Sequence, residues 1–162
     1  MANVRVLTAD DWSAYRVTRL DALRTDPDAF GSSFAHEAAF TEEEWRVRVT
    51  PPGGAVFGID GEGGLVATGA VITDWTDPDA RVLVAMWTGV PHRGLGLGRM
   101  IVEAAIAHAR GSGAASIRCS VTEGNDGAAR LYTSCGFVQT GETEVRESDG
   151  LLHSHLALRF RD

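Results

Sequence analysis

The chain has 162 residues, of which 44% are apolar and 23% charged, and we expect one globular domain over residues 1–162. The formal net charge of -7 argues against a nucleic-acid partner, because such proteins neutralise phosphates with a basic surface. All 15 cationic side chains are arginines, and the lack of lysine excludes a Walker-type phosphate loop and a lysine Schiff base.

Cysteine usage and hydropathy predict a cytoplasmic protein. Cys119 and Cys135 are too few for a disulfide framework or a thiolate metal site, so we expect free buried thiols. No apolar run follows Met1, and no stretch approaches the roughly 18 apolar residues that a membrane span needs. We therefore expect a cytoplasmic location and no membrane partner.

The first fifty residues predict a short strand and two helices. Residues 4–6 alternate between apolar and polar side chains, as in a strand. Thr8 is expected to cap a helix that Pro27 ends, and residues 30–34 read as a loop with exposed aromatic side chains. Thr41 begins a capping-box pattern, which predicts the start of a second short helix.

The rest of the chain predicts mostly strands. After the turn-forming residues 51–54, the patterns indicate strands over residues 55–60, 65–73, 81–88, 117–121, 137–146 and 152–160. Two further helices are expected, from the glycines at 94–98 to about Arg110 and over residues 125–134. The predicted fold class is α+β, with a mixed, mostly antiparallel sheet of about six or seven strands flanked by about four helices.

The most informative segment lies directly between a strand and a helix and reads Arg93-Gly94-Leu95-Gly96-Leu97-Gly98-Arg99. Alternating glycines let the backbone approach a ligand, and the free amides and dipole of the helix start favour a phosphate group. The arginines at both ends supply further donors for phosphate oxygens. The dinucleotide pattern G-x-G-x-x-G fails, because its last glycine would fall on Arg99 or Ile101. A turn that only packs the helix on the strand is the alternative.

A second constellation lies on the helix predicted over residues 125–134. Asn125 and Tyr132 are two helical turns apart and are expected on one side, with the small side chain of Ala128 between them. That spacing leaves room for a ligand chain beside the helix. For Tyr132 alone, a packed tyrosine with a satisfied hydroxyl is the competing interpretation.

Together these segments resemble the GNAT superfamily of acetyl-CoA-dependent N-acetyltransferases, and the resemblance covers most of the chain. Met86-Trp87-Thr88 and the loop from Arg93 to Gly98 are similar to the family's central strand and its pyrophosphate loop. Residues 125–137 are similar to its second coenzyme A motif, and residues 26–33 to the loop after its first helix. The resemblance implies the three-layer α/β arrangement of that family.

The resemblance also implies roles for these residues. The backbone of Met86, Trp87 and Thr88 would pair with the pantetheine arm of acetyl-CoA and polarise the thioester carbonyl. The amides of residues 95–99 would hold the pyrophosphate, Asn125 would contact the cofactor, and Tyr132 would be the proton donor to the departing thiolate.

The general base and the acceptor stay open. Several members of the family carry a Glu where this chain has Ser120, so either water relays the proton or Glu123 or Asp74 reaches in. Phe30 and His153 are candidates for contacting the acceptor. His153 and His155 lie on one strand face without a third ligand, so we expect no metal.

The sequence therefore predicts an enzyme that transfers an acetyl group from acetyl-CoA to the amine of a small molecule, an amino acid or a peptide N-terminus, in a ternary complex. The alternatives are a non-catalytic acyl-CoA-binding module and an acyltransferase with another donor or an O-acceptor. Apolar strand ends near the C-terminus would permit a homodimer.

Overall fold

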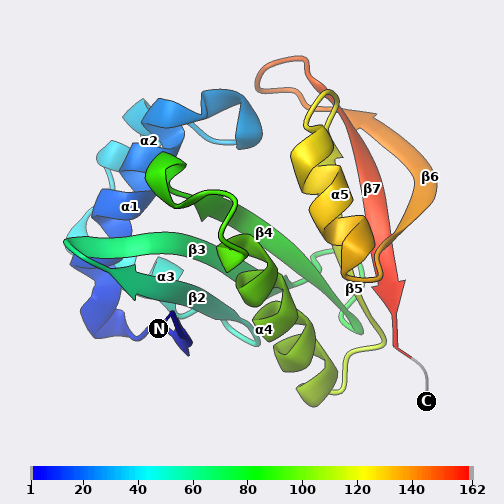
Figure 1. Cartoon of the computed structure of the whole chain (residues 1–162), viewed down its shortest axis with the longest axis horizontal. Coiled ribbons are helices and arrows are strands. Elements are labelled where there is room, and N and C mark those ends of the chain that lie inside the picture. The colour runs from blue at the N-terminus through cyan, green and yellow to red at the C-terminus, as the bar shows by residue number, and fades with distance from the viewer. Residues whose placement is uncertain (1, 161–162) are drawn as a thin grey trace.

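The computed structural model describes residues 2–160, which fold into a seven-stranded sheet with helices on both faces (Figure 1). The strands are β1 (Val4–Val6), β2 (Ala55–Gly61), β3 (Gly64–Thr73), β4 (Ala80–Thr88), β5 (Ser116–Thr122), β6 (Val138–Val145) and β7 (Leu152–Arg159). The helices are α1 (Trp12–Thr25), α2 (Phe34–Ala38), α3 (Glu42–Val49), α4 (Leu97–Gly111) and α5 (Asp126–Ser134). Three 3-10 turns cover Ala9–Asp11, Pro27–Ala29 and Val90–His92.

The sheet confirms the predicted fold class. Its strand order is β1-β2-β3-β4-β5-β7-β6, and every neighbouring pair is antiparallel except β4 and β5. The parallel pair joins through α4, as a crossover helix does in a mixed sheet. None of the described helices is both long and apolar enough to cross a membrane.

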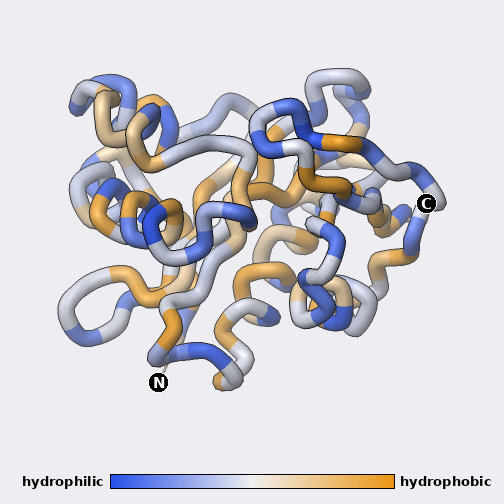
Figure 2. The backbone as a smooth tube through the Cα atoms, turned by 90° about the horizontal axis from the view of Figure 1, so that it is seen from above, coloured by the Kyte–Doolittle hydropathy of each residue, from blue (hydrophilic) through white to orange (hydrophobic). Residues whose placement is uncertain are grey.

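Two buried clusters hold the helices on opposite faces of the sheet. Along β2, Ala55 and Phe57 point into the cluster under α4 and α5, while Val56 points into the cluster under α1 and α3. This alternation follows from the two-residue period of a strand. The apolar stretches in Figure 2 accordingly run through the middle of the molecule, between the helices and the sheet.

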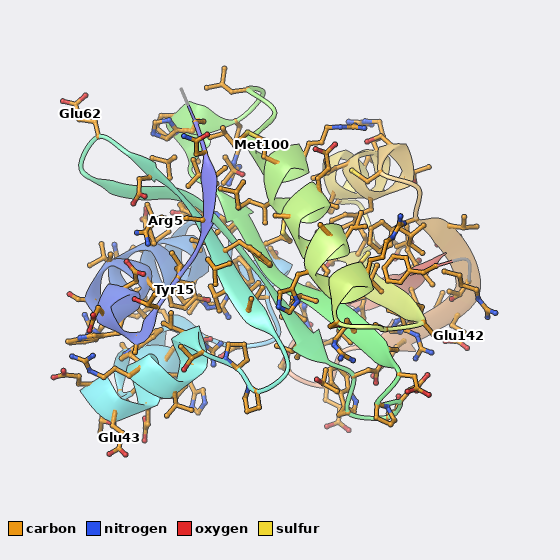
Figure 3. The ribbon with its side chains drawn as sticks, turned by 90° about the horizontal axis from the view of Figure 1, so that it is seen from below. Arg5, Tyr15, Glu43, Glu62, Met100 and Glu142 are labelled. Atoms are coloured by element: carbon orange, nitrogen blue, oxygen red, sulfur yellow. The ribbon has the colours of Figure 1, made fainter. Side chains whose placement is uncertain are left out.

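Helix signals in the sequence account for most helix ends. In α3, the Thr41 Oγ1 accepts from the Glu44 amide (3.2 Å) and the Glu44 carboxylate accepts from the Thr41 amide (3.1 Å), which is the expected capping box. Helix α4 buries Ile101, Val102 and Ala105, which lie on one face of its 3.6-residue period. Figure 3 shows Glu43 and Glu62 pointing away from the body of the protein, and Tyr15 pointing from α1 toward its interior.

One expectation for residues 30–34 was wrong. Phe30 is buried with 7% of its surface exposed, and the guanidinium of Arg19 stacks on its ring at 4.5 Å. Phe34 begins helix α2, which the sequence analysis did not predict, and Ser33 caps that helix by accepting from the His36 amide. The apolar ring of Phe30 is withdrawn because it completes the cluster under α1.

Candidate active site

Strands β4 and β5 diverge, and this divergence opens the sheet at its centre. They pair only at their first residues, where Ala80, Arg81 and Val82 face Ser116, Ile117 and Arg118. Beyond Val82 the edge of β4 that faces β5 has no strand partner, although β5 stays paired with β7 as far as Thr122. We call this unpaired region, residues 83–88 of β4 and 119–122 of β5, the fork. Its free backbone groups can pair with an extended ligand.

A bulge bends β4 inside the fork. The register with β3 shifts between Thr68 and Ala70, and Ala85 has φ +57°, the only positive φ of a non-glycine residue in the described chain. Such a bulge gives β4 one extra residue and re-aims its backbone. A left-handed alanine costs free energy, and strained backbone of this kind gathers at ligand sites. The bulge lies at Ala85 and Met86 and so reaches into residues 86–88, where the sequence predicts the cofactor contact.

The glycine loop follows β4 and delivers the chain to α4. Gly94 and Gly96 have φ values of +78° and +81°, which glycine adopts without strain. None of the backbone N–H groups of residues 94–99 donates to another described residue. The first turn of α4 therefore presents a row of free amides at the positive end of its dipole, as anion sites do. A Cβ on Gly98 would lie 3.2 Å from Leu131, so this glycine lets α4 approach α5.

The two arginines that flank the loop are engaged by the protein itself. Arg93 Nε donates to the Thr88 carbonyl (2.9 Å), and its Nη2 donates to Asp26 (2.6 Å). Arg99 Nε donates to Glu103 (3.1 Å) and its Nη1 to the Ser134 hydroxyl (3.0 Å). Both guanidinium groups remain nearly half exposed (45% and 49%) and keep further N–H donors, so they can assist the free loop amides in binding an anion.

Asn125 and Tyr132 lie at the two ends of α5. Asn125 is the N-cap residue, and its Oδ1 accepts from the Ala128 amide (3.2 Å). Its side-chain NH2 is left over from this cap and can donate to a ligand. Ala128 and Tyr132 both face the cluster shared with α4. The structure therefore brings the predicted residues of α5 to the side of the helix that adjoins α4 and the fork.

Tyr132 is an apolar-packed tyrosine whose hydroxyl has no hydrogen-bond partner among the described residues. Its ring is 7% exposed and tilts against Phe137 at a centroid distance of 5.8 Å. Burial, with smaller contributions from Cys119 and Cys135, raises the pKa of the Tyr132 hydroxyl above its ordinary value of about 10. The group therefore stays protonated at neutral pH and can donate a hydrogen bond.

Residues predicted to contact an acceptor line two adjoining hollows. Phe30 lines one of about 790 Å³ and His153 lines one of about 650 Å³, and Gly31 and Ser148 belong to both. His153 pairs with Thr122, the last residue of β5, so its hollow lies at the open end of the fork. Figure 1 shows the α2 region and the loop between β6 and β7 at this same end of the sheet.

Charged groups hold the walls of these hollows together. Arg146 Nη2 donates to the Asp28 carbonyl oxygen (2.7 Å), which ties the β6–β7 loop to the segment after α1. Carboxylates outnumber guanidinium groups in the linings, which include Asp28, Asp149, Glu144 and Glu147 beside one arginine. The surface is therefore better matched to a cation than to an anion.

The structure separates the three positions considered for a general base. Asp74 lies beside the start of β4, where Arg118 (3.1 Å) and the Thr76 amide (2.7 Å) bind it. At about 3.3 Å per residue, the nine residues of β4 put it far from the open end. Glu123 follows β5 at the open end and is exposed, as is Ser120. Of the two acids, only Glu123 lies where the fork opens.

The contacts that join these parts have no signal in the sequence. Asp26, which the sequence placed only within the loop of residues 26–33, accepts hydrogen bonds from both Trp87 and Arg93. Arg146 was not singled out at all. Both contacts link residues more than sixty positions apart, and no local pattern in the sequence signals them. His153 and His155 have ring centroids 5.8 Å apart, and no described group of three or more potential ligands could hold a metal.

Comparison with known proteins gives one consistent picture. The model of the Acetyltransferase (GNAT) family matches residues 10–137. Comparison with curated protein sequences gives no match. Among solved structures, an acetyltransferase of the GNAT family from Streptococcus pneumoniae superimposes with a TM-score of 0.82 at 18% identity, covering 99% of this chain and 100% of that one.

Two further structures share the fold. The protein yncA from Salmonella typhimurium, solved with its cofactor acetyl-CoA, has a TM-score of 0.76 at 19% identity, covering 100% of this chain and 95% of that one. The ribosomal-protein-alanine N-acetyltransferase from Brucella melitensis has a TM-score of 0.76 at 20% identity, covering 98% and 99%. At these identities the likeness concerns the fold.

Proposed function

The chain belongs to the Acetyltransferase (GNAT) family, and we propose that it transfers the acetyl group of acetyl-CoA to the amine of a small molecule, an amino acid or a peptide N-terminus. The observation that carries the proposal is that the unpaired edge of β4 in the fork leads into the loop with the free amides. The extended pantetheine arm and the diphosphate next to it are the two parts of coenzyme A that such a surface can bind. The match of the family model confirms the resemblance that the sequence motifs indicated, at the level of the family.

In this proposal the cofactor lies between α4 and α5. Its pantetheine arm pairs with the free edge of β4 at residues 86–88, and its diphosphate accepts from the amides of residues 95–99. Asn125 donates its side-chain NH2 to the arm, which passes the small side chain of Ala128. Arg93 and Arg99 support the loop from outside. Charge-assisted bonds of this kind contribute roughly 1.5–3 kcal/mol each.

The chemistry then requires little beyond positioning, because the thioester is already activated. The amine nitrogen attacks the thioester carbonyl, the C–N bond forms, and the C–S bond breaks to release the coenzyme A thiolate. An amine that arrives protonated loses one proton before its nitrogen attacks and a second as the C–N bond forms, and both pass to water or to a carboxylate such as Glu123 at the open end. Backbone N–H groups near the bulge of β4 stabilise the negative charge on the carbonyl oxygen.

Tyr132 donates a hydrogen bond to the departing sulfur of coenzyme A. A free tyrosine has a pKa near 10 against roughly 8.5 for a thiol, so full proton transfer is uphill by about 2 kcal/mol. Burial raises the pKa of Tyr132 further and makes transfer still less favourable. We therefore assign Tyr132 to hydrogen-bond stabilisation of the thiolate, with water completing the protonation.

The acceptor enters from the two hollows at the open end. Phe30 offers an apolar ring edge, His153 a polar side chain, and the carboxylates of the linings attract a protonated amine. This charge balance supports an amine in preference to an anionic acceptor.

Purified protein with acetyl-CoA and a panel of amines tests the proposal. The panel should hold aliphatic amines, amino acids and peptides with free N-termini, with an alcohol series beside them. Release of coenzyme A thiol that depends on one amine, together with the acetylated product in mass spectrometry, is the expected result. Coenzyme A binding without thioester consumption would identify a non-catalytic module instead, and acetylation of alcohols alone would identify an O-acyltransferase.

A further inference from the structure

The carboxylate of Asp26 joins three parts of the site that are far apart in the sequence. Its Oδ2 accepts from the indole Nε1 of Trp87 (2.8 Å) and from the Nη2 of Arg93 (2.6 Å). Asp26 itself is fixed, because it closes α1 with its amide donating to Ala22 and precedes Pro27, which cannot continue a helix. The backbone of Asp26 therefore holds its carboxylate in a fixed position beside residues 27–36.

The first of the two hydrogen bonds, from Trp87 to Asp26, holds strand β4. Trp87 is only 9% exposed and packs in the cluster under α1 together with Phe30. No described acceptor other than Asp26 receives its indole N–H. Trp87 stands two residues after the strained Ala85, so the bond fixes the bulged stretch of backbone where the thioester is proposed to lie.

The second hydrogen bond, from Arg93 to Asp26, holds the glycine loop. Arg93 donates Nε to the Thr88 carbonyl and Nη2 to Asp26, and so closes residues 88–93 into a ring. The free amides follow directly at residues 94–99. Burial opposes ionisation of Asp26, but the hydrogen bonds from Trp87 and Arg93 outweigh it and lower its pKa. The carboxylate therefore stays charged and both bonds persist at neutral pH.

We propose that Asp26 is a positioning residue for acetyl transfer, which sets the bulge of β4 through Trp87 and the pyrophosphate loop through Arg93. Because Asp26 directly precedes residues 27–36, it also fixes the position of the hollow lined by Phe30 relative to strand β4. This inference rests on the proposed acetyltransferase function. It assigns to one carboxylate two separable effects, on turnover and on acetyl-CoA binding.

Steady-state kinetics with acetyl-CoA and the best amine of the panel separate the effects of the two hydrogen bonds to Asp26. Trp87→Phe removes the indole donor together with part of the buried ring, and should lower kcat. Asp26→Asn keeps an oxygen for Trp87 but loses the charge facing Arg93, so it should raise the KM for acetyl-CoA several-fold and affect kcat less. Asp26→Ala loses both hydrogen bonds and should lower kcat/KM by about tenfold to a hundredfold, because small misplacements of the reacting groups have effects of this size.

Two comparisons make the test specific. Asp26→Ala should have little further effect on kcat in a Trp87→Phe background, because both changes break the same bond. Asp60→Ala is the matched control, since Asp60 forms an ion pair of equal length (2.6 Å) with Arg5 away from the site, and it should leave kcat and KM unchanged.

The outcomes are distinguishable. Wild-type protein that takes up no coenzyme A in calorimetry contradicts the proposed function itself. Active wild-type protein whose Asp26→Asn and Trp87→Phe variants both keep the wild-type kcat and KM overturns only the role of Asp26. If Asp26→Ala does not fold, these two conservative variants still decide the question.

Discussion

The thioether of Met86 occupies the space above Gly69 across the β3–β4 ladder, where a Cβ on Gly69 would lie 2.5 Å from Met86 Sδ. The same Cβ would lie 2.5 Å from Ile101 in α4. Glycine at this position therefore lets the bulge residue Met86 turn under α4. The shape of the proposed thioester site depends on this missing side chain.

Gly69→Ala should destabilise the protein and lower its activity. Overpacking costs about 1–3 kcal/mol, which exceeds the roughly 0.4–1 kcal/mol that alanine gains by restricting the unfolded chain. Because Met86 must move, kcat should fall as well.

Denaturant unfolding and steady-state kinetics check this prediction. Gly111→Ala, at the end of α4 with open space around its Cβ, is the control; it should leave kcat close to wild type and raise the stability slightly, because alanine fits there without strain. A Gly69→Ala variant with wild-type stability and kcat would show that the bulge does not depend on this packing.

Tyr132→Phe should slow turnover greatly while leaving coenzyme A affinity nearly unchanged, because the hydroxyl acts only when the thiolate forms. The matched control is Tyr15→Phe, since Tyr15 is buried in the cluster on the opposite face and should not affect kcat. Stopped-flow or steady-state kinetics with calorimetry separate the two effects. Equal turnover in Tyr132→Phe and wild type would remove Tyr132 from the mechanism.

The raised pKa of Tyr132 also predicts a pH dependence. Its folded-state pKa lies above the ordinary value of about 10, so the stabilisation that it contributes is complete below pH 10 and is lost as pH rises through the folded value. Wild-type kcat should therefore show no loss from Tyr132 ionisation between pH 6 and about 10. A basic limb near pH 8 that disappears in Tyr132→Phe would contradict this assignment.

Asn125 combines two roles that substitution can separate. Asn125→Ala should cost about 0.5–2 kcal/mol of stability, because α5 loses its cap. Asn125→Asp keeps the capping oxygen and should stay close to wild type in stability, but it loses the amide donor and should bind coenzyme A more weakly. Thermal unfolding and calorimetry test both effects. Unchanged coenzyme A affinity in Asn125→Asp would leave the residue only a capping role.

Local chemistry made most of the fold predictable from the sequence. Alternating apolar residues located the strands, the capping box at Thr41 located the start of α3, and the helix predicted from Asn125 agrees with the start of α5 within one residue. Helix α2 escaped prediction because its five residues make little more than one turn, too few for an apolar spacing to repeat, and only Ser33 marks its start. Helix α4 starts at Leu97, within the predicted range 94–98, because Gly94 and Gly96 adopt positive φ values outside the helix.

The parts of the site that depend on distant contacts were not predictable. An alanine with positive φ has no sequence signature, so the bulge at Ala85 could not be foreseen. The bond from Trp87 to Asp26 spans 61 positions, and the apolar surroundings that raise the pKa of Tyr132 come from several elements. The residues of the glycine loop were predictable because their function uses backbone amides, which the glycine spacing reveals directly.

Calorimetric titration of coenzyme A into wild type, Gly96→Val and Gly63→Val tests the central claim that the loop amides hold the diphosphate. Gly96 and Gly63 have nearly equal φ values of +81° and +86° with open space around the Cβ, so both variants pay a similar backbone strain of about 1–2 kcal/mol. We predict that wild type and Gly63→Val bind coenzyme A alike, while Gly96→Val loses most of the affinity. Equal binding by all three proteins, or no binding by any, would contradict the account.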